Sequence, residues 1–381
     1  MVRTRAIRIV LVSAVLIAPG GLSTWASAQT NYPRVFIFDP AELSVARQAY
    51  HAKGPSSPEL AAIERNADKL MQSGAFSVVT KDATPPSGDK HDYMSQAPYF
   101  WPDPKSANGL PYIRRDGERN PEINKITDHR VLDEMESAVE TLALAYYFTG
   151  KEKYAAKAAA LLRVFFLDPS TRMNPNLQFA QAIPGVNTGR GIGLIETRGL
   201  TRVIDAIGLL SPAKSWSASD QKGLESWVAQ FLQWMLESKN GRDEAAAKNN
   251  HGTFYDVQIV SFALFLNRRD LARSVLEQAK PKRIAVQIEP DGRQPLELAR
   301  TKAWSYSVMN LEGLFTLARL GENVGVDLWN YETKDGRSIR KAIHFLMPFA
   351  NGEKKWPYQQ LGEFQPEMFF HLLTRSAAHY K

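Results

Sequence analysis

Apolar residues recur at three- and four-residue steps along most of the chain, which is the spacing of one face of an α-helix. The clearest run covers residues 128–149, and Gly150 follows it, a residue type common just after a helix end. A second helix is predicted over residues 153–168, where Pro169 stops it. Together the two segments predict a helical hairpin.

The hairpin pattern recurs three more times: at residues 201–210 with 224–238, at 257–279 with a polar turn at Asn267–Arg269, and at 310–331 with a turn at Gly321. Hairpins repeated at intervals of roughly fifty to seventy residues are typical of helices stacked into a solenoid or closed into a toroid. We therefore expect an all-α fold.

Strand signals are scarce. Residues 283–292 are compatible with a short extended segment or a loop edge, and Pro290-Asp291-Gly292 predicts a turn. Two long segments, 78–127 and 168–193, are rich in Pro, Gly, Asp and Asn and break the helical pattern. Loops of this length are usually functional or disordered. Their aromatic residues argue against disorder.

The N-terminus has the three-part pattern of a secretory signal peptide. Three arginines and no acidic residue occupy the first eight positions, an apolar run extends from Ile9 to about Ala18, and Ala26-Ser27-Ala28 follows. The apolar run is short for a membrane span, and no later run resembles it. We expect a signal peptide over residues 1–28 with cleavage near Ala28, and a periplasmic or secreted protein.

Composition narrows the possible partners. The chain has no cysteine, so neither a disulfide nor a thiolate metal ligand is available. Its formal charge is +7, and removing the three arginines of residues 1–28 leaves about +4. This mild charge neither demands nor excludes an anionic partner. No dense Lys/Arg stripe is present, so nucleic acid is not an expected partner. The sequence does not indicate the oligomeric state.

The segment AAAKNNHGTFYDVQ, residues 245–258, interrupts the helical pattern. Asn249, Asn250 and Gly252 are poor helix formers and suit a turn, or a helix start, whose polar groups face something. A capped helix start with a solvated His251 would explain this stretch by itself.

A second unusual segment, QAPYFWPDP, presents Tyr99, Phe100 and Trp101 between prolines. Aromatic rings of this kind offer flat, partly polar surfaces on which sugar rings can pack. A loop pinned to the domain by its own aromatics would look the same.

The segment 296–320 predicts another helix. One face is traced at steps of four, three, four and three by Trp304, Val308, Leu311, Phe315 and Ala318. If the helix already includes Arg300, then Arg300 and Tyr306 are about 120° apart around its axis and can border one pocket. Taken alone, the pair is better explained as a solvated arginine and a half-buried tyrosine.

Together, KNNHGTFYDVQ, PLELARTKAWSYS followed by LEGL, and YFWPDP resemble the alginate lyase superfamily of helical-toroid polysaccharide lyases, notably polysaccharide lyase families 5 and 38. The likeness covers about residues 60–350. It implies an incomplete (α/α) toroid with long loops lining a cleft, here a single domain over residues 29–381. It also implies β-elimination on uronic-acid polysaccharides. At the matching positions the implied catalytic residues are Asn250, His251, Arg300 and Tyr306. The spacing from Arg to Tyr is closer to the branch that accepts glucuronan, so both alginate and glucuronan are candidate substrates.

These residue types suit the chemistry of elimination. The C5 proton of a uronate lies next to the C6 carboxylate, and removing it builds negative charge on that group. Arg300 can fork onto two oxygens and the Asn250 amide can donate to one, which neutralises the charge. No metal or other cofactor is then required.

A base and an acid complete the reaction. His251 can remove the proton near neutral pH, and Tyr306 can protonate the leaving O4. Tyr306 can also be the base if a nearby cation lowers its pKa. Elimination on one face of the sugar can use the tyrosine for both steps, whereas elimination across opposite faces uses His251 and Tyr306 in turn.

Six further residues are candidate substrate contacts: Tyr99, Trp101, His129, Gln178, Arg198 and Lys302. Each also has a simpler explanation. His129 stands in a predicted first helical turn, Arg198 can pair with Glu196, Lys302 can be solvated, and Gln178 is chosen only for its place in the second long loop.

Two other functions compete with the lyase. A glycoside hydrolase needs two carboxylates beside the scissile bond, and Glu196, Asp256, Glu289 and Asp291 are available. A polysaccharide-binding protein of the cell envelope would use the aromatics and arginines without His251 or Tyr306. A metal site is poorly supported, because no histidine pair has helical ligand spacing.

Overall fold

Helices dominate the computed structural model, which describes residues 32–55 and 57–380. They are α1 (Pro40–Lys53), α2 (Pro58–Leu70), α3 (Asp128–Thr149), α4 (Glu152–Leu162), α5 (Leu200–Leu210), α6 (Ala218–Glu237), α7 (Lys239–Ala245), α8 (Asn250–Phe265), α9 (Arg269–Ala279), α10 (Ala285–Gln287), α11 (Pro295–Leu298), α12 (Ala303–Glu322), α13 (Ile339–Ala350) and α14 (Phe370–His379). The signal peptide predicted for residues 1–28 lies outside the described residues. No helix of the described chain is long and apolar enough to cross a membrane.

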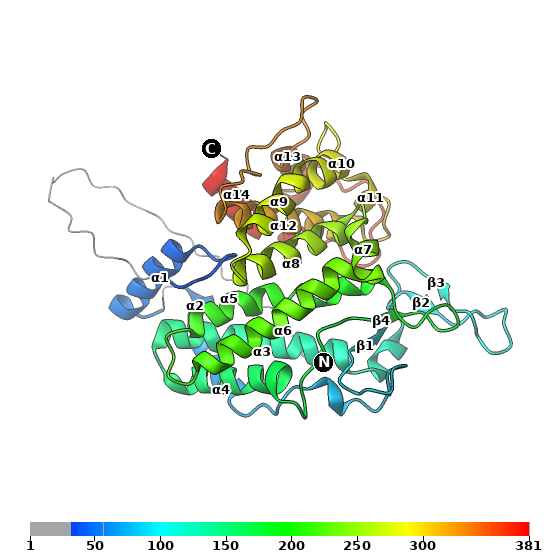
Figure 1. Cartoon of the computed structure of the whole chain (residues 1–381). Helices are drawn as coiled ribbons and strands as arrows, with labels where there is room; N and C mark the ends of the chain where they lie inside the picture. Colours follow the sequence, from blue (N-terminus) through cyan, green and yellow to red (C-terminus); the bar gives the residue numbers. More distant parts are fainter. Residues whose placement is uncertain (1–31, 56, 381) are drawn as a thin grey trace, which may run out of the picture.

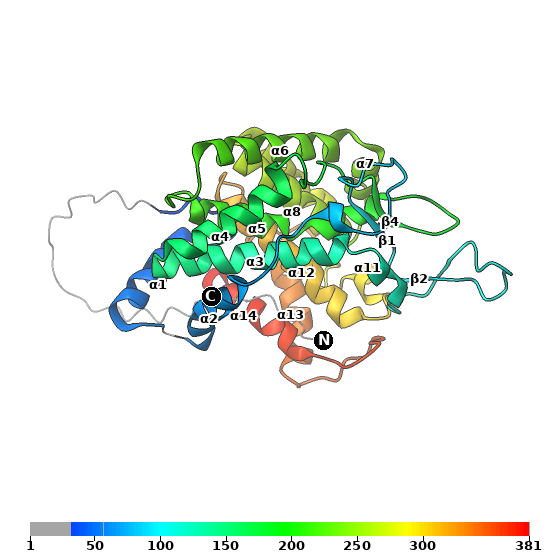
Figure 2. The same ribbon diagram turned by 90° about the horizontal axis from the view of Figure 1, so that it is seen from below.

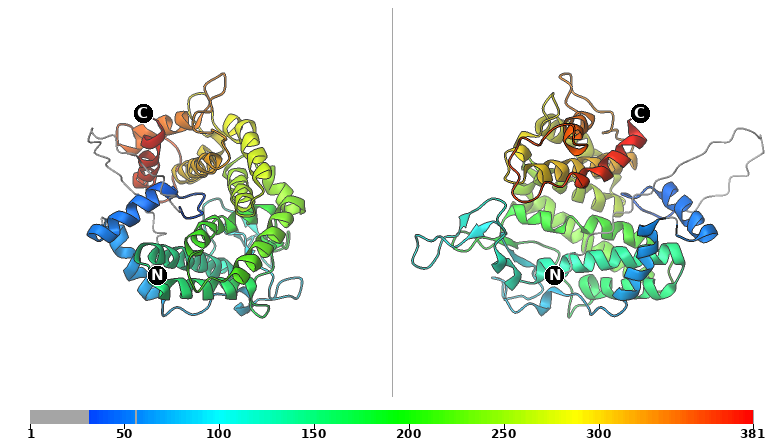
Figure 3. Two further views of the ribbon diagram at one scale, coloured as in Figure 1. Left: turned by 60° about the vertical axis from the view of Figure 1, so that its left-hand side comes forward. Right: turned by 180° about the vertical axis from the view of Figure 1, so that it is seen from behind.

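The helices form the expected (α/α) toroid. Helix α3 packs against α4 and α5, and α8 packs against α9 and α12. In the left panel of Figure 3 the helices follow one another around a ring, and the first helices (blue) come round towards the last (red). An ion pair of 3.3 Å between Asp39, just before α1, and Arg319 on α12 links the two ends of this ring.

Local sequence explains several element boundaries. Gly150 takes a left-handed conformation directly after α3, as predicted from its place after the apolar run. A capping box between Ser217 and Asp220 starts α6. The polar turn at Asn267–Arg269 separates α8 from α9, with Asn267 at a positive φ of 58°.

Two predicted elements were wrong. Residues 310–331 do not form a hairpin, because α12 runs to Glu322 and the chain beyond it is irregular up to α13. Residues 283–292 are not extended at their start, since a π-helical turn (Lys280–Ile284) continues into α10. The turn predicted at Pro290-Asp291-Gly292 is present, and Gly292 there has a φ of 90°.

The two long segments are ordered and meet each other. Strand β1 (Met94–Gln96) from the first pairs in parallel with β4 (Phe179–Ala182) from the second. Within the first segment, β2 (Phe100–Trp101) pairs with β3 (Ile113–Arg114). Figures 1 and 2 show these strands at the same end of the toroid as α7 and α11. The long loops therefore gather at one end of the helical ring.

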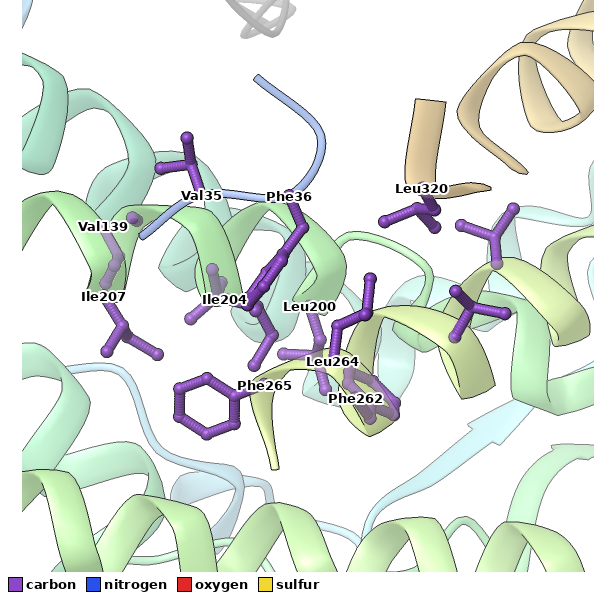
Figure 4. Packing of buried hydrophobic residues seen from close by; sticks show 14 of the residues in the cluster. Val35, Phe36, Val139, Leu200, Ile204, Ile207, Phe262, Leu264, Phe265 and Leu320 are labelled. Carbon is purple, nitrogen blue, oxygen red and sulfur yellow. The ribbon is translucent and has the colours of Figure 1, made fainter. Parts of the chain in front are cut away.

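Away from the end of the toroid where the long loops gather, residues 34–38 insert into the core. Val35 and Phe36 pack among apolar side chains of α3, α5, α8 and α12, as Figure 4 shows. The carboxylate of Asp205 on α5 accepts hydrogen bonds of 2.8–2.9 Å from the backbone N–H groups of Phe36, Ile37 and Phe38. This segment is thereby tied to the inner helices.

Candidate active site

The two asparagines and the glycine of the interrupted segment mark the start of α8. Asn249 caps the helix, since its side chain accepts a hydrogen bond from the N–H of His251 at 3.3 Å. A side chain at Gly252 would meet the carbonyl of Ala247 and the guanidinium of Arg283. A helix start was one of the two predicted alternatives, and it is the one observed.

Asn250, the first residue of α8, is only 1% exposed. Its backbone N–H and its Nδ2 donate to the two carboxylate oxygens of Glu297 on α11, each at 2.7 Å. This carboxylate satisfies an end amide of α8 and opposes the positive end of the helix dipole. Burial raises the pKa of Glu297, although the hydrogen bonds from Asn250 act against this. The sequence interpretation directed the Asn250 amide at a substrate, whereas here one of its hydrogens is held by Glu297.

His251 is not freely solvated. Its Nδ1 lies 2.7 Å from Oε1 of Glu244 on α7, and the two side chains are 15% and 1% exposed. With Oε1 of Glu244 as the acceptor, Nδ1 carries the hydrogen and Nε2 keeps the free lone pair; this tautomer is assigned from the partner. The remaining oxygen of Glu244 is buried without a partner in the described chain.

Arg300 lies between α11 and α12, so the 120° angle predicted for a shared helix does not apply. Its Nη2 donates to Asp116 at 2.8 Å and its Nε at 3.1–3.2 Å. Burial alone would raise the pKa of Asp116, but the hydrogen bonds from Arg300 and from the N–H of Thr301 outweigh it and hold that pKa well below its usual range. The Arg300 guanidinium also rests on the Tyr306 ring, with Cζ 3.7 Å from the ring centroid.

Tyr306, in the first turn of α12, donates its hydroxyl hydrogen to the Tyr99 hydroxyl at 2.9 Å. Burial raises the pKa of Tyr306, the hydrogen bond with Tyr99 adds to this, and the charge of Arg300 only partly offsets it. The phenol is therefore neutral at neutral pH. The cation over its ring is Arg300.

These contacts join the four predicted catalytic residues into one network. Glu297 holds Asn250 and lies close enough to Arg300 and His251 for their charges to act on its carboxyl group. Arg300 in turn rests on Tyr306. Two direct contacts and the charges that act on Glu297 thus relate the four residues to one another.

A hollow of about 300 Å³ opens beside α11 and is lined by Arg293, Pro295, Leu298, Ala299 and Tyr358. Glu297 belongs to the same short helix, so the hollow neighbours the network. None of the four predicted catalytic residues lines it. Asn250 contacts Glu297 and Arg300 contacts Tyr306, and the charges of Arg300 and His251 act on Glu297.

The alginate lyase family model matches residues 77–356, which include the whole network. The chain belongs to the alginate lyase family. It is accordingly a polysaccharide lyase.

Solved structures agree with this assignment. An alginate lyase from Bacteroides ovatus is 41% identical, with a TM-score of 0.87, and the match covers 91% of this chain and 92% of that one. A variant of alginate lyase A1-III complexed with a tetrasaccharide is 15% identical, with a TM-score of 0.57 over 89% of this chain and 88% of that one. The A1-III enzyme from Sphingomonas species A1 is 14% identical, with a TM-score of 0.52 over 88% and 86%. The last two share the toroid fold with this family member. A search of curated proteins found no match.

Three of the predicted substrate contacts lie near the loops of this end. Tyr99 touches the network directly through Tyr306. Trp101 is half-buried and donates its Nε1 hydrogen to the carbonyl of Glu118 at 2.9 Å, a contact within the same long segment. His129 lies in the first turn of α3, 3.6 Å from Asp133, and its Nδ1 is buried without a hydrogen-bond partner in the described chain.

The other three have weaker links to the network. The Arg198 side chain is exposed and donates to the carbonyl of Ile195, so it does not pair with Glu196. Lys302 is the residue before α12 and forms a backbone bridge with Gln360. The Gln178 side chain is exposed, and only its backbone carbonyl contacts α7, through Asn240.

The carboxylates considered for a hydrolase are all engaged elsewhere. Glu196 accepts hydrogen bonds from Tyr93 and Ser95. The others pair with arginines: Asp256 with Arg283, Glu289 with Arg337, and Asp291 with Arg293. Within the described ranges, no group of three or more His, Cys, Asp or Glu residues could hold a metal ion.

Sequence reasoning missed the residues that hold the network: Asp116, Glu244 and Glu297. Glu244 lies seven positions before His251, a spacing that two separate helices bring together and that no helical repeat predicts. Glu297 is part of the segment PLELAR, three residues before Arg300, and was the only one with a local signal. Asp116 is 184 positions from Arg300, beyond the reach of local patterns.

Proposed function

We propose that this family member cleaves uronic-acid polysaccharides by β-elimination, with alginate as the first candidate substrate and glucuronan as the second. The family match and the similarity to the Bacteroides ovatus alginate lyase support the substrate class. The contact network of Asn250, His251, Arg300 and Tyr306 supports the chemistry.

The observation that carries the proposal is the placement of Arg300. Asp116 holds one edge of its guanidinium and the Tyr306 ring supports its face. Its Nη1 makes no hydrogen bond within the described chain and is not among the buried atoms without a partner, so it is accessible. A cation fixed in this way needs no reorganisation when the C6 carboxylate of a uronate arrives. Arg300 therefore neutralises that carboxylate as charge builds on it.

Asn250 assists Arg300 through its amide. Glu297 accepts one Nδ2 hydrogen at 2.7 Å and thereby fixes the amide plane. The second Nδ2 hydrogen is then available to one oxygen of the carboxylate. Because only 1% of Asn250 is exposed, the substrate carboxylate can contact only one edge of the amide group.

His251 and Tyr306 move the proton. The Nε2 lone pair of His251, oriented by Glu244, removes the C5 proton, and the imidazolium that forms is stabilised by the carboxylate. The electron pair of the C5–H bond forms the C4–C5 double bond, and the C4–O4 bond breaks. Tyr306, a neutral phenol, gives its proton to the departing O4. The alternative in which Tyr306 is the base requires its proton to pass first to another group, and Tyr99 is its hydrogen-bond partner.

Product analysis tests this proposal. Purified protein is incubated with alginate and, separately, with glucuronan, and both ultraviolet absorbance of the C4–C5 double bond and new reducing ends are followed. We expect equal amounts of the two signals on at least one polymer. Reducing ends without the absorbance would show hydrolysis, and binding without either signal would show a non-catalytic protein. His251→Ala should lower the rate by about 10²–10⁴-fold with folding intact.

A location outside the cytoplasm fits a polymeric substrate. The proposed mature protein is one domain over residues 29–381, released by cleavage near Ala28. The mass of the protein recovered from the periplasm or medium tests this. A mature chain beginning at Gln29 is expected, and a chain that retains Met1 would contradict it.

A further inference from the structure

Arg190 is a half-buried arginine without an ion pair in the described chain. Its Nη2 donates to Oε1 of Gln181 at 2.8 Å, and its Cζ lies 5.1 Å from the centroid of the Phe100 ring. Its Nε is buried and has no acceptor. Burial lowers the pKa of Arg190, and the charges of Glu196 and Glu244 only partly offset this, since neither carboxylate forms an ion pair with it in the described chain. An acceptor supplied by a ligand would account for this.

The backbone around Arg190 is fitted closely to its neighbours. A side chain at Gly191 would meet the Asn240 carbonyl at 2.6 Å, and one at Gly189 would meet the Gln178 carbonyl. Gln181 has a positive φ of 51°, which is strained for a residue other than glycine. Such strain is common where a side chain must be aimed, and here the Gln181 amide holds the Arg190 guanidinium.

Arg190 also lies between the two halves of the catalytic network. On one side, Phe100 pairs in register with Arg114, and Arg114 donates to Asp116, the partner of Arg300. On the other side, a side chain at Gly191 would lie 3.1 Å from the backbone nitrogen of Glu244. The charges of Arg114 and Glu244 both act on Arg190. The guanidinium therefore belongs to the same end of the molecule as the network.

We propose that Arg190 binds the carboxylate of a second uronate, the sugar next to the one that is cleaved. This assignment rests on the proposed function. The Nη1 atom makes no hydrogen bond in the described chain and is not buried, and Nη2 keeps one free hydrogen beside Gln181. This edge of the guanidinium matches the two oxygens of a carboxylate. Arg190 thus selects polymers with consecutive uronates.

The expected effect differs from that of a catalytic residue. The second carboxylate carries the same charge before and during the reaction, so Arg190 stabilises the bound substrate and the transition state alike. Its loss should raise KM and leave kcat nearly unchanged. Removing a bidentate charged contact should raise KM by about 10- to 100-fold.

Arg190→Gln tests this, with Arg172→Gln as the control. Arg172 is an exposed cation of the same long segment whose side chain has no contact in the described chain, so its loss removes one charge without touching the site. Both variants are compared with the wild type on the preferred uronan and on the same polymer after reduction of about half its carboxylates to alcohols. We expect a raised KM for Arg190→Gln on the intact polymer, a wild-type KM for Arg172→Gln, and a smaller difference between Arg190→Gln and wild type on the reduced polymer.

A second variant keeps the test informative if Arg190→Gln fails to fold. Glycine adopts the φ of Gln181 without strain, so Gln181→Gly keeps the backbone and releases the Arg190 guanidinium. Its KM should rise several-fold. A wild-type KM in both Arg190→Gln and Gln181→Gly, or a fall in kcat alone, overturns the Arg190 assignment while the lyase proposal stands. Wild-type protein that releases no unsaturated product from any uronan overturns the proposed function and this assignment with it.

Discussion

At the scale of single residues, the state of the Tyr306 hydroxyl decides its role. Burial and the Tyr99 hydrogen bond raise its pKa, so the group reaches the sugar as a proton donor. Tyr306→Phe removes the proton and leaves the ring on which Arg300 rests. We expect kcat to fall by about 10²–10⁴-fold, measured by absorbance of the unsaturated product.

Tyr146→Phe is the matched control for this change. Tyr146 is a partly buried tyrosine on α3 with no side-chain hydrogen bond in the described chain, and its variant should keep wild-type activity. Wild-type kcat in a folded Tyr306→Phe enzyme would remove Tyr306 from the mechanism.

Glu244 supports a second prediction at this scale. It fixes the His251 tautomer through the 2.7 Å contact with Nδ1, so Glu244→Ala frees the ring to turn. A misoriented base loses up to the ~10²–10⁴-fold contribution of general base catalysis, with little change in KM. Glu237→Ala, at an exposed position on α6, is the control.

Recovery of part of the rate in Glu244→Asp would support the positioning role. An unchanged kcat in folded Glu244→Ala, with or without a raised KM, would contradict it.

The family resemblance predicted Asn250, His251, Arg300 and Tyr306 as catalytic residues, and their side chains suit the cation, amide, base and acid that elimination demands; this assignment stays a prediction. Their partners could not be predicted in the same way. Asp116 and Glu244 act through pairings between separate elements, and no local pattern encodes which carboxylate a folded chain will bring to which base. The hydrogen bond between Asn250 and Glu297 was not predicted either.

At the scale of elements, the inserted segment 34–38 depends on Asp205. Its carboxylate accepts three backbone N–H groups, and no other acceptor for them is present in the described chain. Asp205→Ala leaves three donors without partners and should lower the free energy of unfolding by roughly 3 kcal/mol or more. Chemical denaturation measures this. Asp82→Ala, at an exposed position, should have no measurable effect, and equal stability of the two variants would show that the segment is not held by Asp205.

Helix ends could be predicted from the sequence where a capping residue or a clear helical spacing of apolar residues was present, as at Gly150 and Asn249. They failed at Arg300, where α12 begins only at Ala303. The cause is tertiary: the N–H of Ala303 donates to the carbonyl of Gln359, and Arg300 itself is drawn to Asp116. The spacing of apolar residues along α12 indicates neither the contact of Ala303 with Gln359 nor that of Arg300 with Asp116.

At the scale of the whole molecule, a buried acid couples stability to pH. Glu136 on α3 is 2% exposed, and its Oε1 has no partner within the described residues. Burial raises the pKa of Glu136 to about 8. Between its ordinary pKa and this value the folded chain keeps a proton that the unfolded chain releases. The stabilising contribution is therefore complete at acidic pH and is lost as the pH rises towards 8, at up to about 1.4 kcal/mol per pH unit.

Glu136→Gln keeps the shape of the side chain and removes the titration. We expect the variant to be more stable than wild type at pH 8 and its stability to change less between pH 5 and pH 8. Denaturant unfolding at both pH values measures this. Glu237→Gln, on the exposed face of α6, should follow the wild type. Parallel pH dependence in Glu136→Gln and wild type would contradict the assignment.

The toroid itself, expected as an incomplete one, was anticipated through the family resemblance, since recurring hairpins alone are equally compatible with an open solenoid. Ring closure depends on contacts such as Asp39 with Arg319, between residues at opposite ends of the chain. The same closure brings the two long segments to one end, where β1 and β4 pair.

The central claim is that a uronate carboxylate is neutralised by Arg300 and Asn250. A crystal structure of the Tyr306→Phe variant with a bound uronate oligosaccharide tests it most directly. The account predicts one sugar carboxylate within hydrogen-bond distance of Arg300 Nη1 and Asn250 Nδ2, with the C5 hydrogen of that sugar facing His251 Nε2. An oligosaccharide bound at this end of the toroid with its carboxylates turned away from Arg300 would contradict it.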